Sequence, residues 1–463
     1  MIKKATLTQL ATFAFSILLT VSCNAQDLKR KAQLGILMSP LADSTAESLN
    51  INKGKGLFIN EVIENSTVTK VGMKPGAVLL KLNKVEVNSN ADLFAQISNL
   101  RAGDPIQFEF IQDGKIISKS TKAAERPKEI NKSANVYYEQ ISSKDKTSRT
   151  ILHNPKGVSN PPVVFYLQGY TCGSIDFSGQ EFNPAYKLIQ QWVDAGYAVF
   201  RVEKPGVGDS ESNKPCSEIN FNEEVEAFRQ AYLHLQKDKR INSDNIFLFG
   251  HSMGGIIAPI LAKEFKPKGV ITFGITVNSW FEYLQELTRV QGEMFHTPYN
   301  EIEENFRRSL PFWYELLVEQ KSNTEILEND FIRKNFEEDE IIEQFKSGQY
   351  MARHYTFWST LNQVNLYKTW LEIESNVLAL YGEFDIQALN AKHIKTIANI
   401  VNAGHEGNGE YKVIPKTDHG FVHFDSMEEN VSALSNGNYF QLIRDNYNPS
   451  TGDYTIEWMN KRQ

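Results

Sequence analysis

The sequence predicts an α/β protein in which a large domain with a mainly parallel sheet and a helical insertion follows a small β-rich α+β domain. Three observations lead to this prediction. Apolar segments typical of buried strands recur through residues 134–463, and one of them runs through a glycine-serine turn into a helix-permissive segment. About a hundred residues between two of those strands have the apolar spacing of amphipathic helices. Residues 32–122 contain short strands joined by turn signals.

The extreme N-terminus has the features of a secretory signal. Lys3 and Lys4 precede an apolar run, Leu10–Val21, that is too short to span a membrane comfortably. Two processing outcomes remain open. In the first, residues 1–22 are a lipoprotein signal, and Cys23, which ends a relaxed lipobox, is lipidated and tethers the chain to a membrane. In the second, ordinary cleavage after Ala25 removes residues 1–25. Either outcome places the mature protein outside the cytoplasm, as a periplasmic, secreted or lipid-anchored protein of the bacterial envelope.

Residues 32–122 are predicted to form a small domain of their own. Its expected elements are the strands Gln33–Leu37 and Gly56–Val62, a turn and a third strand within Gly72–Asn83, the capped helix Asn90–Leu100, and the hairpin Ile106–Gln112 and Lys115–Ser120 with Asp113-Gly114 at its turn. This order of elements resembles a PDZ domain in the permuted arrangement of HtrA-type envelope proteases. The polar segment 123–133 is the predicted linker to the larger domain.

The PDZ resemblance implies a binding site for the C-terminus of a peptide. The peptide would add as a strand beside the opening strand, and the backbone amides of Leu34, Gly35 and Ile36 would hold its carboxylate. Residues of the helix would line or back a side-chain pocket; these are Leu93, Phe94 and Ile97. The sequence leaves open whether this module binds peptides or only packs against the larger domain.

The clearest motif of the chain is Gly250-His251-Ser252-Met253-Gly254, which follows the apolar segment Asn245–Phe249 and precedes Ile256–Phe265. A serine raised on a tight strand-to-helix turn needs almost no side chain two positions before and after it, because the neighbouring strand and helix lie close. The motif therefore predicts a nucleophile elbow with Ser252 as the nucleophile. Strand alternation points His251 away from the nucleophile, so we expect His251 to be packed.

An acid and a histidine follow in the order that serine catalysis on such a fold requires. The buried-type strand Asn376–Gly382 ends at a loop that offers Asp385, with Glu383 as the nearest competitor. A short strand, Tyr411–Pro415, is followed by a loop that presents His419. An imidazole can take and return the serine proton near neutral pH, and the acid would hold its tautomer.

These motifs resemble the α/β-hydrolase superfamily over residues 134–463. The segment Gly196–Ser210 is similar to that family's fourth strand and its glycine turn, which is structural in the family. The resemblance implies an oxyanion hole built from the backbone amides of Met253 and Tyr170. In many members the turn before that second donor reads His-Gly. Gln168 departs from this pattern, but the donor is a main-chain group.

The insertion between the predicted strands Gly269–Gly274 and Asn376–Gly382, about residues 278–372, is predicted to be a helical lid over the serine. Apolar spacing indicates amphipathic helices, as at Leu310, Trp313 and Leu317, and again at Phe331, Phe336 and Ile342. Most of its aromatic residues are expected to form the lid's own core. As a group they also imply a largely apolar pocket.

The remaining cysteines and the charge limit the other possibilities. Cys172 and Cys216 follow neighbouring strands of the family's sheet, so in an oxidising compartment they form either a disulfide or two free thiols. No cluster of metal-binding type is visible in the sequence, and no cofactor is implied. A net charge of −7 gives no electrostatic support for binding to nucleic acid.

The sequence therefore predicts an extracytoplasmic serine hydrolase, in first place a carboxylic ester hydrolase with Ser252, His419 and Asp385 as its triad. A serine peptidase or aminoacyl hydrolase acting on peptide substrates is the alternative within the same chemistry, because fold resemblance does not separate the two. A third hypothesis makes the chain a PDZ peptide-binding adaptor whose hydrolase fold is inactive.

Overall fold

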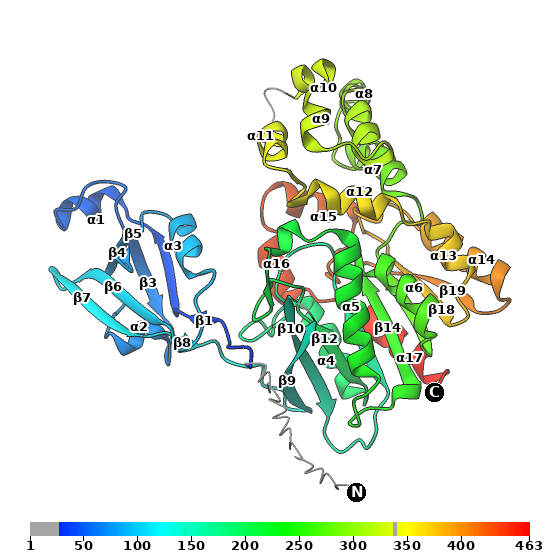
Figure 1. The fold of residues 1–463 in the computed structure, drawn as a ribbon, viewed down its shortest axis with the longest axis horizontal. Coiled ribbons are helices and arrows are strands. Elements are labelled where there is room, and N and C mark those ends of the chain that lie inside the picture. Colours follow the sequence, from blue (N-terminus) through cyan, green and yellow to red (C-terminus); the bar gives the residue numbers. More distant parts are fainter. Residues whose placement is uncertain (1–26, 144, 337–339) are drawn as a thin grey trace, which may run out of the picture.

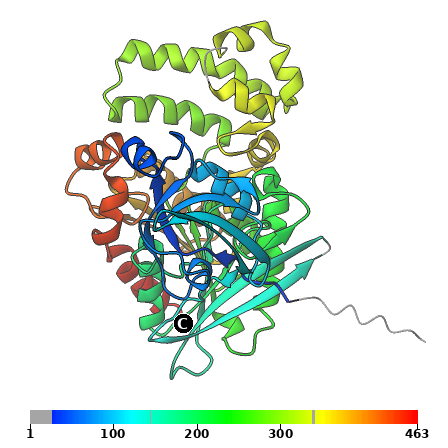
Figure 2. The same ribbon diagram turned by 90° about the vertical axis from the view of Figure 1, so that its left-hand side faces the viewer.

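The computed structural model describes residues 27–463, apart from residue 144 and residues 337–339. The predictions for the signal segment, Cys23 included, lie outside the described residues. A small β-rich domain lies beside a larger α/β domain, and a group of helices covers one end of the larger domain (Figures 1 and 2). Within the described ranges, every helix is too short or too polar to cross a membrane.

The smaller domain is a six-stranded sheet in the order β2-β3-β4-β6-β7, with β5 paired to β4. The side chains of Leu57, Phe108 and Phe110 are fully buried in its core. At the β6–β7 turn Asp113 and Gly114 both have positive φ, as the predicted Asp-Gly hairpin requires. The elements are β2 (Ile36–Pro40), α1 (Asp43–Ser48), β3 (Leu57–Val62), α2 (Thr67–Lys70), β4 (Val78–Leu82), β5 (Val85–Glu86), α3 (Asn90–Ile97), β6 (Pro105–Gln112) and β7 (Lys115–Lys122).

The predicted opening strand is divided in two. Residues Ala32–Gln33 form β1, which pairs with β8 (Ala124–Glu125), and β2 begins only at Ile36. The break occurs because Gly35 takes a left-handed conformation, with a φ of +79°. Beyond the break, β2 is an edge strand, so one of its sides faces no other strand of the sheet.

The predicted linker is anchored at both ends. At its start, β8 pairs with β1, and near its end the carboxylate of Glu129 enters the larger domain, where it is 4 % exposed. There Glu129 accepts hydrogen bonds from Arg201 and from the Phe177 amide, and its Oε2 lies 2.7 Å from Nε2 of His153. The polar composition of this segment therefore reflects buried ion pairing as well as exposure to solvent.

The larger domain is built on a nine-stranded sheet in the order β13-β10-β12-β11-β14-β15-β18-β19, with β9 paired to β10. From β12 to β19 neighbouring strands are parallel, whereas β9, β10 and β13 supply antiparallel pairs. The strands are β9 (Ala134–Ser143), β10 (Lys146–Pro155), β11 (Val163–Leu167), β12 (Ala198–Val202), β13 (Glu211–Ser212), β14 (Ile246–His251), β15 (Gly269–Phe273), β18 (Asn376–Gly382) and β19 (Gly409–Ile414).

Helices cover both faces of this sheet, which explains why its central strands are apolar throughout. On one face Trp192 and Trp458, from α4 and α17, pack against alternate strand residues such as Phe249. On the other face α5, α6 and α14 cover the intervening residues. The helices and single turns of this framework are α4 (Pro184–Asp194), η1 (Cys216–Glu218), α5 (Phe221–Leu235), η2 (Ser243–Asn245), α6 (Gly254–Phe265), α14 (Lys392–Gly404), α15 (Met427–Ser435), α16 (Tyr439–Asp445) and α17 (Ser450–Asn460).

The insertion forms the helical lid at one end of the larger domain (Figure 1). Aromatic side chains make its own core, where Phe312 packs against Phe336, Phe345 and Tyr350. Of the predicted lid positions, Phe331 is instead half exposed. The elements are α7 (Trp280–Met294), α8 (Tyr299–Trp313), a π-helical turn (Tyr314–Val318), α9 (Asn323–Leu327), α10 (Asp330–Asn335), α11 (Glu340–Lys346), β16 (Gln349–Tyr350), β17 (Arg353–His354), α12 (Tyr355–Asn362) and α13 (Leu366–Leu371).

Candidate active site

Ser252 lies on the tight turn between β14 and α6. It has a φ of +53°, a conformation that is costly for a residue with a side chain, and its amide donates a 2.9 Å hydrogen bond to the Phe273 carbonyl. The flanking glycines are needed for space. A Cβ on Gly254 would lie 2.1 Å from the Leu167 carbonyl oxygen, and one on Gly250 would lie 2.5 Å from the Gly254 oxygen. The turn therefore has the geometry of the predicted nucleophile elbow.

Asp385 and His419 meet at the ends of β18 and β19. The Nδ1 atom of His419 lies 2.7 Å from Oδ2 of Asp385, whose side chain is fully buried. The other carboxylate oxygen accepts 2.8 Å hydrogen bonds from the amides of Gln387 and Ala388. These bonds fix the orientation of the carboxylate, with Oδ2 directed at the imidazole. The competing acid, Glu383, is exposed and accepts a hydrogen bond from the Lys416 amide instead.

The environment sets the protonation of the two histidines differently. Burial alone would lower the pKa of His419, but the charge of Asp385 and its hydrogen bond raise that pKa above its usual range. Desolvation, together with the nearby charge of His419, lowers the pKa of the partly buried His251 to about 3. His251 therefore stays neutral, and its Nε2 lies 2.8 Å from the His419 carbonyl oxygen. As predicted, His251 is packed, and its packing partners include the loop that carries His419.

A cavity of about 360 Å³ opens over the serine, between the sheet edge and the lid. Ser252 and His419 line it together with Met253 and Tyr170, the two residues predicted to supply oxyanion donors. Its remaining walls are aliphatic, aromatic or neutral polar: Ile256, Gly274, Ile275, Thr276, Trp280, Tyr283, Leu287, Gln291, Met351, Trp358, Ile386 and Gln387. His419 is thus the one lining residue with an ionisable nitrogen, and carboxylates, ammonium and guanidinium groups are absent from this wall.

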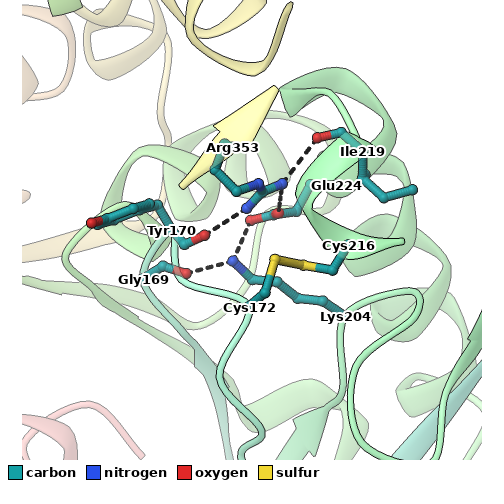
Figure 3. The surroundings of a disulfide bond; sticks show 8 residues. All are labelled: Gly169, Tyr170, Cys172, Lys204, Cys216, Ile219, Glu224 and Arg353. Atoms are coloured by element: carbon teal, nitrogen blue, oxygen red, sulfur yellow. Dashed lines mark hydrogen bonds and ion pairs between the residues drawn. A yellow bond between two sulfur atoms is a disulfide. The ribbon is translucent and has the colours of Figure 1, made fainter. Parts of the chain in front are cut away.

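The loop after β11, residues 168–176, lies directly beside the serine and is called the oxyanion loop below. A Cβ added to Gly169 would lie 3.2 Å from the Ser252 Cβ, so the loop approaches Ser252 closely. Cys172 of this loop forms a disulfide with Cys216 of η1, with 5.9 Å between their Cα atoms (Figure 3). The disulfide thus ties the oxyanion loop to the segment before α5. Groups of His, Cys, Asp or Glu that could hold a metal ion are absent from the described part of the chain.

Comparison with protein families assigns both domains. The family model described as serine aminopeptidase, S33, matches residues 180–424, which is more than half of the chain. The chain belongs to the serine aminopeptidase S33 family. It is therefore a hydrolase of the α/β-hydrolase fold, and the predicted fold class is confirmed. A PDZ-domain model matches residues 32–122, which confirms the resemblance of the smaller domain to PDZ domains.

The curated relatives match the PDZ region of this S33 protein. The periplasmic serine endoprotease DegP of Escherichia coli K12 is 24 % identical over 131 residues, which is 27 % of this chain and 28 % of DegP. DegP of Salmonella typhimurium is 30 % identical over 89 residues, or 19 % of each chain. The chain thus spans less than a third of the length of these relatives.

Solved structures that match include an esterase from Pyrococcus furiosus, at 12 % identity and a TM-score of 0.41, which covers 73 % of this chain and 97 % of the esterase. A proline iminopeptidase from Mycobacterium smegmatis matches at 11 % identity and a TM-score of 0.41, covering 70 % of this chain and 98 % of that structure.

In the PDZ domain two carbonyls of the predicted carboxylate loop bond to the chain on one side of that loop. The Gly35 carbonyl accepts a hydrogen bond from the Ile63 amide and the Leu34 carbonyl accepts one from the Val68 amide. Because the carbonyl and the next N–H of a trans peptide point in opposite directions, the amides of Gly35 and Ile36 point away from those partners. Of the predicted pocket residues, Leu93 is buried in the core, Ile97 is partly buried and Phe94 is 56 % exposed.

Sequence reasoning missed the residues that hold the oxyanion loop from behind. Lys204 donates a hydrogen bond to the Gly169 carbonyl, and Arg353 of the lid donates one to the Tyr170 carbonyl. Lys204 directly follows Glu203 at the end of a predicted strand, but no local sequence pattern indicates that it bonds to the Gly169 carbonyl. Arg353 lies 183 positions from Tyr170, so no spacing rule could have joined them.

Proposed function

We propose that this S33 family member is an extracytoplasmic serine hydrolase that cleaves carboxylic esters. The observation that carries the proposal is the 2.7 Å contact between Asp385 and His419, whose imidazole lines the same cavity as Ser252. A serine on a strained elbow, a histidine held by a buried acid and two neighbouring backbone amides are the components that acyl transfer requires.

The reaction proceeds through an acyl-enzyme. His419 takes the proton of Ser252 as the oxygen attacks the carbonyl carbon, and Asp385 stabilises the imidazolium that forms. The amides of Met253 and Tyr170 bind the oxyanion of the tetrahedral intermediate. His419 then returns the proton to the leaving alcohol, and water repeats the sequence on the acyl-enzyme to release the acid.

The cavity wall favours a neutral acyl group. An aminopeptidase must bind a substrate with a free α-ammonium group, and a buried cation without a counter-charge or full hydrogen bonding is costly. Carboxylates are absent from the lining residues of this cavity, whereas Trp280, Trp358 and Tyr283 provide a large aromatic surface. The cavity therefore suits the apolar acyl part of an ester better than the amino end of a peptide.

Peptide hydrolysis remains the second candidate, because the family model that matches is described as serine aminopeptidase. A panel of acyl nitrophenyl esters and aminoacyl nitroanilides separates the two. We expect ester turnover to exceed anilide turnover by at least about 100-fold in kcat/KM, since an unpaired ammonium would enter the cavity only at a cost of several kcal/mol. Comparable rates for both classes would contradict the ester assignment.

Labelling with a fluorophosphonate probe tests the nucleophile itself. We expect the wild type to be labelled and the Ser252→Ala variant to remain unlabelled. Absence of labelling in both, with peptide binding retained by the PDZ domain, would instead support the adaptor hypothesis. We further propose that the PDZ domain binds a peptide C-terminus at the amides of Leu34, Gly35 and Ile36, so amidation of a bound test peptide should abolish its binding.

Export is proposed from three observations: the signal-like N-terminus, the disulfide, and relatives of the PDZ region that are named periplasmic. Fractionation of a bacterial host tests this proposal. The activity should be found outside the cytoplasm, and a Cys23→Ala variant should lose membrane attachment if Cys23 is lipidated. Retention of the wild type in the cytoplasm would contradict export.

A further inference from the structure

A buried cluster of two basic side chains and one acidic side chain lies directly behind the oxyanion loop (Figure 3). Lys204 follows β12, Glu224 lies on α5, and Arg353 comes from β17 of the lid; each side chain is at most 1 % exposed. Glu224 pairs with both cations, with its Oε1 2.7 Å from Lys204 Nζ and its Oε2 2.8 Å from an Arg353 nitrogen.

Both cations also donate hydrogen bonds to backbone carbonyls. Lys204 donates to the Gly169 carbonyl at 2.5 Å. Arg353 donates to the Tyr170 carbonyl at 2.5 Å and to the Ile219 carbonyl at 3.0 Å. Two consecutive peptide groups of the oxyanion loop are therefore held by positive charges from outside the loop.

The first of these peptide groups is the one that matters for catalysis. The Gly169 carbonyl and the Tyr170 N–H belong to the same peptide group, which is trans, since no cis bond occurs in the described chain. In a trans peptide the two groups point in opposite directions. A hydrogen bond that fixes the carbonyl toward Lys204 consequently fixes the N–H toward the other side of the loop, where Tyr170 lines the cavity with Ser252.

The net charge of the cluster also favours the reaction. Two cations and one carboxylate leave one positive charge in a fully buried setting immediately behind the donor. Charge buried at such a site acts through a low dielectric and attracts the oxyanion that develops in the transition state. A neutral side chain of similar length would fill the space at Lys204 without the cost of burying an ammonium group, so packing alone does not explain a lysine here.

We propose that Lys204 is a positioning residue for the oxyanion hole, which holds the Gly169 carbonyl and thereby aims the Tyr170 N–H at the reacting oxygen. This inference rests on the proposed serine-hydrolase function. Lys204 acts through the peptide group and does not touch the substrate.

The pH dependence of activity supplies a readout that a purely structural role would not affect. Burial lowers the pKa of Lys204 to about 8, with Glu224 on α5 opposing this shift and Arg353 on β17 adding to it. The oxyanion loop faces the ammonium with a carbonyl oxygen. Loss of the Lys204 proton weakens its bond to that carbonyl, so kcat should fall as the pH rises through this pKa. In Glu224→Gln the counter-charge is gone, so this loss should begin at lower pH.

The test compares kcat per active site in the full chain, with sites counted by exhaustive fluorophosphonate labelling. We expect Lys204→Met to lower kcat about 10- to 100-fold with KM changed less than about 3-fold, because losing one oxyanion donor altogether costs about 100- to 1000-fold. Lys204→Arg, which keeps the charge, should recover part of the loss and keep its activity to higher pH. Glu223→Gln is the matched control on the same helix, since Glu223 pairs with Lys214 and lies outside the cluster.

The outcomes separate this inference from the function on which it rests. An active wild type whose Lys204→Met variant keeps kcat per site within about 2-fold would overturn the role of Lys204 and leave the hydrolase intact. If Lys204→Met does not fold, the test uses the alkaline limb of the pH–kcat profile of Glu224→Gln. A limb at the wild-type position in Glu224→Gln, as expected for the control Glu223→Gln, overturns the inference. A wild type that neither turns over esters nor labels at Ser252 overturns both proposals.

Discussion

Gly274, at the end of β15, offers a sharp test of the proposed triad. It has a φ of +70°, and a Cβ built on it would lie 2.8 Å from both Asp385 Oδ2 and His419 Nδ1. Ordinary van der Waals contact begins at 3.4 Å, so alanine would require these atoms to retreat by at least about 0.6 Å. The two atoms are the ends of the 2.7 Å contact that orients the imidazole. The added methyl group therefore presses on that hydrogen bond itself.

We expect Gly274→Ala to lower kcat per labelled site by at least about 100-fold, because a misplacement of this order in a catalytic group costs about that factor. The left-handed backbone should also cost about 1–2 kcal/mol of unfolding free energy. Gly157→Ala is the control, since Gly157 has a φ of +78° and a Cβ there would meet nothing within 4 Å. Both variants should show the cost of the left-handed backbone in urea, with a further loss in Gly274→Ala from the steric clash, but only Gly274→Ala should lose activity. If Gly274→Ala retains more than half of the wild-type kcat, Asp385 and His419 do not act as proposed.

Three further predictions concern the acid of the proposed triad, the buried ion pairs of Arg30 and the disulfide. Asp385→Asn should lower kcat by about 10⁴-fold, because the histidine would lose the group that fixes its tautomer. Glu383→Gln, at an exposed residue, should change kcat less than about 2-fold. The acid limb of the pH–activity profile depends on the raised pKa of His419, so it should move to lower pH when the Asp385 charge is removed. Arg30→Ala should cost about 3–5 kcal/mol in urea unfolding because it leaves two buried carboxylates without their shared cation. Lys29→Ala, which breaks an exposed pair, should cost less than about 1 kcal/mol. Reduction of the Cys172–Cys216 disulfide with dithiothreitol should lower kcat per labelled site, because the disulfide ties down the oxyanion loop. It should also cost about 4 kcal/mol of unfolding free energy, estimated from the 44-residue separation of the two cysteines. Unchanged activity after complete reduction would contradict this role of the disulfide.

The sequence predicted the sheet because its strands obey local rules. A buried parallel strand needs a continuous apolar run, and β11, β12 and β15 are buried at every position. The elbow is equally local, since its glycines and its serine lie within five consecutive residues. The family model supports the fold that these patterns predicted.

The acid and the histidine could be named because each follows a predicted strand, and parallel strands bring their carboxyl ends to one edge of the sheet. The choice between Asp385 and Glu383 rested on little in the sequence. The structure separates them by burial. Glu383, directly after the strand end, has turned outward to the Lys416 amide, whereas Asp385, two residues later, has turned inward to His419. Such a difference depends on the course of one turn, which composition does not encode.

Contacts between remote polar residues were beyond prediction. The linker was assigned from its polar composition, but the burial of Glu129 depends on Arg201 and His153, which lie 72 and 24 positions away. In the same way, the charge of Arg30 is buried between Asp176 and Asp209 of the other domain. A buried ion pair and two exposed charges can consist of the same residue types, so only the fold distinguishes them.

The proposed site is completed by segments that the catalytic motifs do not include. On one side, Tyr283 and Gln291 of the lid helix α7 donate hydrogen bonds to the carbonyls of Gln387 and Ile386, in the loop that carries the acid. On the other side, Arg353 of the lid holds the oxyanion loop.

The PDZ domain reaches the same region along the chain segment 203–209. Arg101, just after α3, donates hydrogen bonds to the carbonyls of Gly208 and Asp209, and at the start of that segment Lys204 holds Gly169. One short segment thus contacts the PDZ domain at its end and the oxyanion loop at its beginning. The segment therefore joins a contact with the PDZ domain to the bond that holds the Gly169–Tyr170 peptide group.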